Sequence, residues 1–136
     1  SRLTHMLDTN VCIDAIRNRS RLLVERIRSR SVDDIAISVI TLSELQHGIA
    51  KSGYPEKNRV AMLEFLVPFA VLPFDDMAAR SYGQIRATLE AQGTPIGPMD
   101  MLIAAHALSR HVVLVTNNVD EFRRVPGLSV ENWIAP

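Results

Sequence analysis

Short apolar segments alternate with longer amphipathic segments along the whole chain, and this alternation restricts the possible folds more than any other feature. The apolar segments predict strands at residues 5–7, 35–38, 70–74, 112–115 and 128–130. The amphipathic segments predict helices at residues 11–18, 19–30, 41–53, 56–65, 75–93 and 99–110. Strands that alternate with helices predict βαβ units, and therefore an α/β fold whose mostly parallel sheet has helices on both faces.

Composition limits the class of protein. The 136 residues are 47% apolar and 22% charged, which is typical of one globular domain, so we expect a single domain over residues 1–136. The 15 basic and 15 acidic residues cancel, so net charge gives no argument for nucleic-acid binding. One cysteine, Cys12, excludes an internal disulfide and a thiolate zinc site. No apolar segment approaches the ~20 residues that cross a bilayer, and no secretory signal pattern is present, so we expect a cytoplasmic protein that makes no membrane contact.

Acidic residues stand beside the ends of the predicted strands. Asp8 follows the first strand, and Asp100 lies in the first turn of the helix before the fourth strand. Thr41 and Glu44 have the spacing of a capping box, which places Glu44 in the first turns of the helix after the second strand. Because ligand sites in parallel sheets lie outside the carboxyl ends of the strands, we expect these carboxylates to gather there. Each of them alone is equally well explained as a cap or turn residue.

Carboxylates that gather in this way repel one another, so they require a cation or raised pKa values. Hard oxygen ligands, with neither thiolates nor an obvious set of histidines, favour Mg²⁺ or Mn²⁺ over zinc or copper. A divalent ion on a few carboxylates is an arrangement used for phosphoester hydrolysis. The spacing therefore makes these acids candidates for a divalent-metal site, with cap and turn roles as the alternative.

Four segments contain the candidate acids and their neighbours: Met-Leu-Asp-Thr-Asn at 6–10, Ser-Glu-Leu with Gly at 43–48, Gly-Pro-Met-Asp at 97–100 with the apolar run to 107, and Val-Thr-Asn-Asn at 115–118 with the ending through Trp133. Together these segments resemble the PIN-domain ribonucleases, and in particular the VapC toxins of bacterial type II toxin–antitoxin pairs. The resemblance implies a PIN-like three-layer α/β/α sandwich and a metal-dependent endoribonuclease. Residues 83–100 and the C-terminal segment are most similar to the branch that cuts initiator tRNA in its anticodon loop.

The resemblance also implies roles for individual residues. Asp8, Glu44 and Asp100 correspond to ligands of one or two Mg²⁺ or Mn²⁺ ions. Many PIN domains have a fourth acid where this chain has Asn118, so Asp120 is expected to supply it, with Glu121 as the alternative. Side chains that orient the ligands and waters are expected at Asn10, Thr116 and Asn118.

Arginines are concentrated near the N-terminus. Six of them lie within residues 17–30, where Glu25 is the one acidic residue. This cluster predicts either an RNA phosphate-binding flank or a solvated helix face. The candidates for RNA binding are Arg17, Arg26, Arg28 and, further along, Arg86.

The resemblance implies partners as well. VapC relatives form homodimers and are inhibited by a VapB-type antitoxin, in a heterotetramer or hetero-octamer. The apolar helical region of residues 49–69 is a candidate for either interface, or simply part of the core.

Three other functions stay open at this point. The loss of an acid at Asn118 allows a catalytically inactive PIN-like module that binds RNA or protein. A phosphoaspartyl enzyme with Asp8 as nucleophile is disfavoured because Asn10 stands where a second aspartate is usual. A signal-receiver domain is disfavoured because the last lysine is Lys57, too early in the chain.

Overall fold

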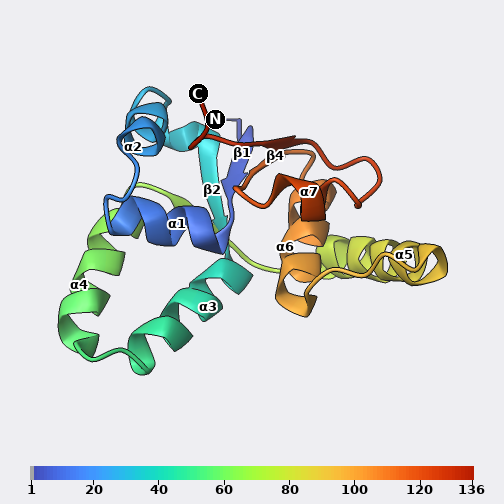
Figure 1. The fold of residues 1–136 in the computed structure, drawn as a ribbon, viewed down its shortest axis with the longest axis horizontal. Coiled ribbons are helices and arrows are strands. Elements are labelled where there is room, and N and C mark those ends of the chain that lie inside the picture. The colour runs from blue at the N-terminus through green and yellow to red at the C-terminus, as the bar shows by residue number, and fades with distance from the viewer. Residues whose placement is uncertain (1) are drawn as a thin grey trace.

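The computed structural model describes residues 2–136, and its centre is one sheet of five parallel strands (Figure 1). The strands are β1 (His5–Leu7), β2 (Ile35–Ser38), β3 (Ala70–Leu72), β4 (Val113–Val115) and β5 (Val130–Glu131). Their order across the sheet is β3-β2-β1-β4-β5, and every neighbouring pair is parallel. The predicted α/β class with a parallel sheet is therefore confirmed.

Helices connect the strands and cover both faces of the sheet. They are α1 (Thr9–Ile16), α2 (Arg21–Arg28), α3 (Val39–Ala50), α4 (Pro55–Leu66), α5 (Asp76–Gln92), α6 (Pro98–Ser109) and α7 (Val119–Phe122), with a 3₁₀ turn η1 (Val32–Asp34) before β2. In Figure 1, α1, α2 and α4 lie to the left of the sheet, and α5, α6 and α7 lie to its right. This arrangement is the three-layer α/β/α sandwich.

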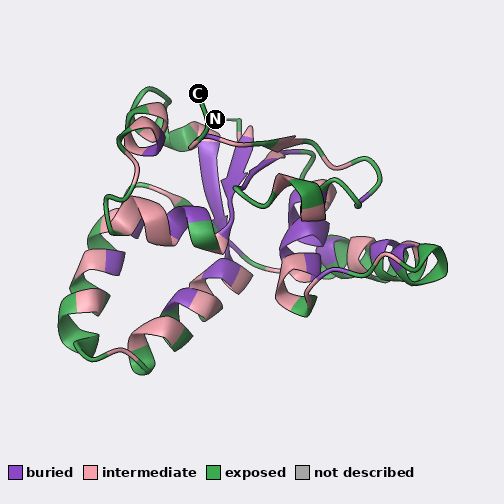
Figure 2. Cartoon of the chain, in the orientation of Figure 1, coloured by how far each residue is buried: buried purple, intermediate pink, exposed green. Residues whose placement is uncertain are grey.

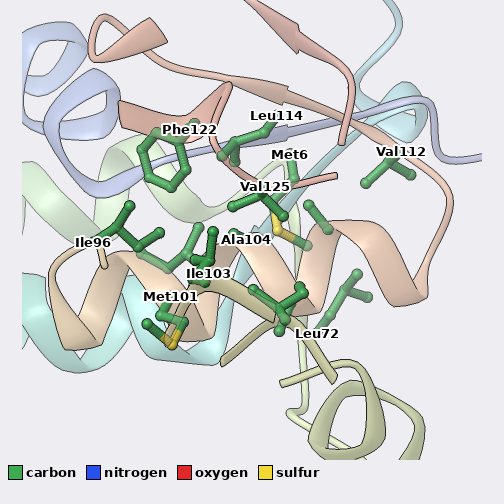
Figure 3. Close-up of a cluster of buried hydrophobic side chains, with 14 of the residues drawn as sticks. Met6, Leu72, Ile96, Met101, Ile103, Ala104, Val112, Leu114, Phe122 and Val125 are labelled. Carbon is green, nitrogen blue, oxygen red and sulfur yellow. The ribbon is translucent and has the colours of Figure 1, made fainter. Parts of the chain in front are cut away.

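The inner strands β1 and β2 are fully buried because both of their faces contact helices, as the purple strands at the centre of Figure 2 show, whereas the edge strands β3 and β5 are partly exposed. Successive side chains of a strand point to opposite faces of a sheet. Met6 and Leu114 accordingly pack with Ile103 and Ala104 of α6 (Figure 3). Leu7 and its neighbours on the other face form a second core with residues of α1, α2, α3 and α4.

The order in which the chain adds strands to the sheet reverses at the centre of the sheet, beside β1. The chain runs from β1 outward through β2 to β3, and then returns to β4 on the other side of β1 before ending at β5. Leu7 of β1 pairs with Val115 of β4, so the residues that follow these two strands begin side by side. Such a reversal point, at the carboxyl ends of the strands, is where open α/β sheets bind ligands.

Several boundaries differ from the predicted ones, and two of these differences have clear chemical reasons. The third strand ends at Leu72 and not at residue 74, because Pro73 has no N–H to continue the ladder. The predicted capping box is wrong: α3 begins at Val39, where Ser38 Oγ accepts a hydrogen bond from the Ile40 N–H at 3.1 Å. Thr41 therefore lies inside α3 and is buried. The last strand begins at Val130 rather than at residue 128, and the one-turn helix α7 is not among the predicted elements.

Across residues 2–136, none of the helices combines the length and the apolar character that a membrane span requires.

Strand β4, which pairs with the central strand β1, gives a direct test of this core. Leu114 is fully buried between the sheet and α6, so Leu114→Ala should lower the free energy of unfolding by about 2–5 kcal/mol. Val67 follows α4 and is 82% exposed, so Val67→Ala should change it by less than about 0.5 kcal/mol. Urea unfolding of both variants measures the difference, and equal effects would contradict the packing described above.

Candidate active site at the carboxyl ends of β1 and β4

Asp8 is the first acidic residue of the site, and the end of β1 fixes its position. Its backbone N–H donates to the Val115 carbonyl of β4 at 3.0 Å, and its carboxylate accepts the Val11 N–H at 2.8 Å as the N-cap of α1. The side chain is only 4% exposed, and this burial raises its pKa to about 6. Hydrogen bonds from Thr116 and Val11 oppose the increase, whereas the charges of Asp14 and Glu44 add to it. The carboxylate is therefore held in a position where a negative charge is unfavourable without a cation.

Asp100 approaches the same place from α6. It lies in the first turn of this helix, where Pro98 occupies the first helical position and the positive end of the helix dipole favours an anion. Its pKa is raised to about 7, first by burial and then by the charge of Glu121 and a hydrogen bond with the Glu121 carboxyl group. Asp8 and Glu44 raise it further, which shows that these carboxylates act on one another electrostatically.

Glu121 is the acid that stands beside Asp100. Its Oε1 accepts the Gly97 N–H at 3.0 Å, and its Oε2 accepts a hydrogen bond from Asn118 Nδ2. A Cβ atom placed on Gly97 would lie 3.6 Å from Asp100 Oδ2 and 3.8 Å from Glu121 Oε1, so both oxygens border the same side of this glycine. Two carboxyl groups this close need a shared proton or a nearby cation. Asp120, the neighbour of Glu121 in the first turn of α7, is exposed.

Glu44 reaches the site from the second turn of α3. Its Oε1 accepts a hydrogen bond of 2.5 Å from Thr9 Oγ1 at the start of α1. The Thr9 hydroxyl also lies 3.2 Å from Thr41 Oγ1. Glu44 is thereby connected to the residue that directly follows Asp8 in the chain.

The loop after β4 holds the polar residues around these acids. Thr116 is buried, lowers the pKa of the Asp8 carboxyl group, and accepts the Asn118 N–H at 3.0 Å. Asn117 Nδ2 donates to Asp14 Oδ2 at 3.0 Å, which ties this loop to α1. Asn10 is exposed and contributes to the wall of a groove beside Glu44.

Asp14 is an acid that the sequence motifs do not reveal. It lies one and a half turns along α1, and its charge is among the causes that raise the pKa of Asp8. Its carboxylate accepts hydrogen bonds from Asn117 and, at 3.3 Å, from Arg19. The helical spacing of residues 8 and 14 does not predict that Asp14 belongs to the site, because Asn117 in the loop after β4 makes the hydrogen bond that connects them.

The donor set suits a hard divalent cation, but a complete cage is not preformed. Within residues 2–136, no three His, Cys, Asp or Glu side chains lie close enough together to form a metal-ligand group. Mg²⁺ usually retains several waters and takes only one or two carboxylates directly, so it does not require such a cage. Buried Asp8, and Asp100 with Glu121 beside it, provide carboxylate oxygens of this kind, and a cation would lower the raised pKa values of Asp8 and Asp100.

A groove of about 610 Å³ begins at Glu44 and runs between α1, α3 and α4. Its apolar residues include Ile13, Leu45 and Met62, and its basic residues are Arg17, Arg19 and Lys51. The arginine cluster is thus divided. Arg17 borders this groove, whereas Arg26 donates to the Asn132 carbonyl at 3.0 Å and borders a separate pocket beside Trp133.

The other two predicted RNA-binding arginines lie outside the groove. Arg28 is exposed in the last turn of α2. Arg86 lies on α5, where its guanidinium donates to Tyr82 Oη at 3.0 Å and to Glu90 at 3.2 Å.

Comparisons with known proteins agree with this geometry. The family model for the PIN domain matches residues 5–128. The chain is 47% identical over 131 residues to the tRNA(fMet)-specific endonuclease VapC of Salmonella typhimurium, which covers 96% of this chain and 98% of the relative. It is 39% identical over 132 residues to Ribonuclease VapC2 of Rickettsia felis, with 96% and 98% covered.

Solved structures give the same result. The DNA-bound VapBC of Salmonella typhimurium matches with a TM-score of 0.92 and 46% identity, over 96% of this chain and 98% of that one. VapBC2 of Rickettsia felis, bound to a DNA fragment from the promoter, matches with a TM-score of 0.91 and 39% identity, over 96% and 99%. Because the sequence match and the structural match both extend over nearly all of the chain, the protein belongs to the VapC family of PIN-domain ribonucleases.

Proposed function

We propose that this chain is the toxin of a type II toxin–antitoxin pair and cuts RNA as an endonuclease that depends on Mg²⁺ or Mn²⁺. The observation that carries the proposal is the convergence of carboxylates from β1, α3, α6 and α7, in which Asp8 and Asp100 have pKa values raised to about 6 and about 7. A cluster with these properties binds a divalent cation more readily than it serves as a structural cap.

The proposed substrate is initiator tRNA, cut in its anticodon loop in the cytoplasm. The Salmonella typhimurium relative, at 47% identity, is named a tRNA(fMet)-specific endonuclease. The substrate of this chain is proposed from that likeness, while the chemistry rests on the site itself.

In the proposed mechanism Asp8 and Asp100 hold the cation, and Glu44 and Glu121 bind it directly or through water. When bound, such a cation polarises the phosphoryl group and makes a coordinated water more acidic. Thr116 keeps the Asp8 carboxylate oriented, and Asn118 keeps Glu121 beside Asp100. Hydrolysis in line with the scissile bond leaves 5′-phosphate and 3′-hydroxyl ends.

Glu121 is the better candidate for the fourth acid than Asp120. Its carboxyl group contacts Asp100 and Asn118, whereas the Asp120 side chain is exposed. This placement compensates for the asparagine at position 118, and therefore favours an active nuclease over the inactive binding module.

The proposed protein partner is a VapB-type antitoxin, with the toxin as a homodimer in a heterotetramer or hetero-octamer. The solved neighbours from Salmonella typhimurium and Rickettsia felis are VapBC complexes. The groove between α1, α3 and α4 combines an apolar floor with Arg17, Arg19 and Lys51, which suits an amphipathic segment with an acidic face.

The carboxylates give the most direct test of catalysis. Asp8→Asn and Asp100→Asn should each lower the rate of Mg²⁺-dependent tRNA cleavage by about 100-fold or more, because each removes several kcal/mol of charge stabilisation. Gel analysis of initiator tRNA incubated with each purified variant measures the rate. Undiminished cleavage by either variant would contradict the assignment, and chelation with EDTA should stop the wild-type reaction.

A matched pair decides the fourth acid. Glu121→Gln should reduce cleavage by about 10- to 100-fold, whereas Asp120→Asn, at an exposed neighbouring position, should leave it nearly unchanged. The same cleavage assay applies. The reverse order of effects would assign the role to Asp120.

The raised pKa values predict how stability depends on pH in the absence of metal. Folded Asp8 and Asp100 retain protons up to about pH 6 and about pH 7, whereas the unfolded chain loses them near the ordinary value of 3.8. The folded state therefore binds more protons across this window, so its stability should fall as pH rises through it, by at most about 1.4 kcal/mol per pH unit for each group. Thermal unfolding in EDTA from pH 4 to pH 8 measures this trend.

Variants separate these two groups from other titrating residues. Asp100→Asn should flatten the decline and raise the melting temperature in EDTA near pH 8, whereas Asp120→Asn should leave the curve unchanged. Adding Mn²⁺ near pH 8 should stabilise the wild type and have little effect on Asp100→Asn. A wild-type melting temperature that rises steadily from pH 4 to pH 8 in EDTA would contradict the prediction.

Arg17 is the arginine that we assign to an RNA phosphate beside the acids. In an Asp100→Asn background, Arg17→Ala should weaken tRNA binding. It should also reduce the slope of log affinity against log salt concentration by about one, the amount expected for the loss of one phosphate contact. Arg86→Ala is the control, because Tyr82 and Glu90 already engage that guanidinium. Filter binding over a range of salt concentrations measures both slopes, and equal slopes for Arg17→Ala and the parent would overturn the assignment.

A further inference from the structure

Glu44 differs from the other acids of the site in how it is held. Asp8 and Glu121 accept backbone N–H groups, from Val11 and Gly97. Glu44 is instead held by a side chain: its Oε1 accepts a hydrogen bond from the Thr9 hydroxyl at 2.5 Å. The orientation of this carboxylate therefore depends on the orientation of one threonine.

A threonine hydroxyl has a single hydrogen, which settles the direction of the hydrogen bonds around Thr9. Its oxygen lies 2.5 Å from Glu44 Oε1 and 3.2 Å from Thr41 Oγ1. The shorter contact, to a charged acceptor, takes the Thr9 hydrogen. The Thr41 hydroxyl then donates to Thr9, so the order of donation runs from Thr41 through Thr9 to Glu44.

Thr41 is in a position that gives its hydroxyl a fixed direction. The residue is fully buried on α3, one turn before Glu44, and it faces α1. A buried hydroxyl without a partner is unfavourable, so Thr41 has a strong preference for the Thr9 oxygen. A donor on Thr9 Oγ1 also polarises that group and strengthens its bond to the carboxylate.

We infer that Thr41 is a positioning residue for the acidic site: its buried hydroxyl fixes Thr9, and Thr9 in turn holds the Glu44 carboxylate toward Asp8 and Asp100. The inference rests on the proposed function, because it assigns a purpose to the position of Glu44 as a cation ligand. It also gives a function to the Thr41-x-x-Glu44 spacing that differs from helix capping. Ser38, and not Thr41, caps α3.

The test measures cation affinity separately from catalysis. Free Mn²⁺ is followed by electron paramagnetic resonance as the metal-free protein is titrated. Thr41→Val keeps the shape of the side chain and removes the hydroxyl, and it should weaken Mn²⁺ binding by about tenfold. Thr41→Ser restores the donor and should return the affinity to nearly the wild-type value.

Thr94→Val is the matched control for the loss of a buried hydroxyl. Thr94 Oγ1 is buried before α6 and has no hydrogen-bond partner within residues 2–136, so its removal should leave the Mn²⁺ affinity unchanged. Circular dichroism and urea unfolding establish that each variant is folded at the temperature of the titration. If Thr41→Val does not fold, Thr9→Val and Thr9→Ser test the same connection at a partly exposed position.

A double-variant cycle separates positioning from a merely structural role. If Thr41 acts through Thr9, then adding Thr41→Val to Thr9→Val should cause no further loss of Mn²⁺ affinity. A contact that only joins α1 to α3 would lower stability and leave the affinity of the folded protein unchanged. The metal dependence of tRNA cleavage should shift by the same factor as the Mn²⁺ affinity.

The outcomes distinguish this inference from the proposed function. Wild-type protein that binds no Mn²⁺ would overturn the proposed function, and the inference with it. Wild-type protein that binds Mn²⁺ while folded Thr41→Val binds it equally well would overturn only the role of Thr41. Independent, additive losses from Thr9→Val and Thr41→Val would also overturn it.

Discussion

The mutual repulsion of carboxylates at the carboxyl ends of β1 and β4 is the constraint on which the rest of the site depends. Asp8 is almost fully buried, and its pKa is raised even though Thr116 and the Val11 N–H both stabilise its charged form. Asp100 has a still higher pKa, which is raised first by burial and then by the charge of the neighbouring Glu121. A fold that brings these groups together loses stability near neutral pH unless something positive binds between them. Their convergence is therefore better explained by ligand binding than by packing.

The parallel sheet makes this convergence possible. Since β1 lies between β2 and β4, the loops that follow β1 and β4 leave the sheet in opposite directions, and a crevice remains between them. The N-termini of α1 and α6 adjoin this crevice, and their N–H groups partly offset the negative charge. Hydrogen bonds between side chains then set the fine arrangement, from Thr9 to Glu44 and from Asn118 to Glu121.

The strand and helix pattern was sufficient to predict the α/β class, the parallel sheet and the positions of Asp8 and Asp100, because apolar periodicity and strand ends are local properties. It was not sufficient to choose between Asp120 and Glu121. These neighbours are chemically similar, and the choice depends on α7, a single turn too short to have an amphipathic period. Asp14 was missed for a related reason, since its contact with Asn117 joins segments 103 positions apart. The sequence predicts Thr41 as the cap of α3 because Ser38, the residue that caps this helix in the structure, is also the last residue of β2 and is predicted as part of that strand.

In the proposed function, these acids hold a divalent cation between β1 and α6. Anomalous scattering from crystals grown with Mn²⁺ tests it most directly, because the signal places the ion without reference to activity. We expect a peak within coordination distance of the Asp8 and Asp100 carboxylates, and its loss in Asp100→Asn crystals. Ordered crystals in Mn²⁺ with no peak between these two side chains would contradict it.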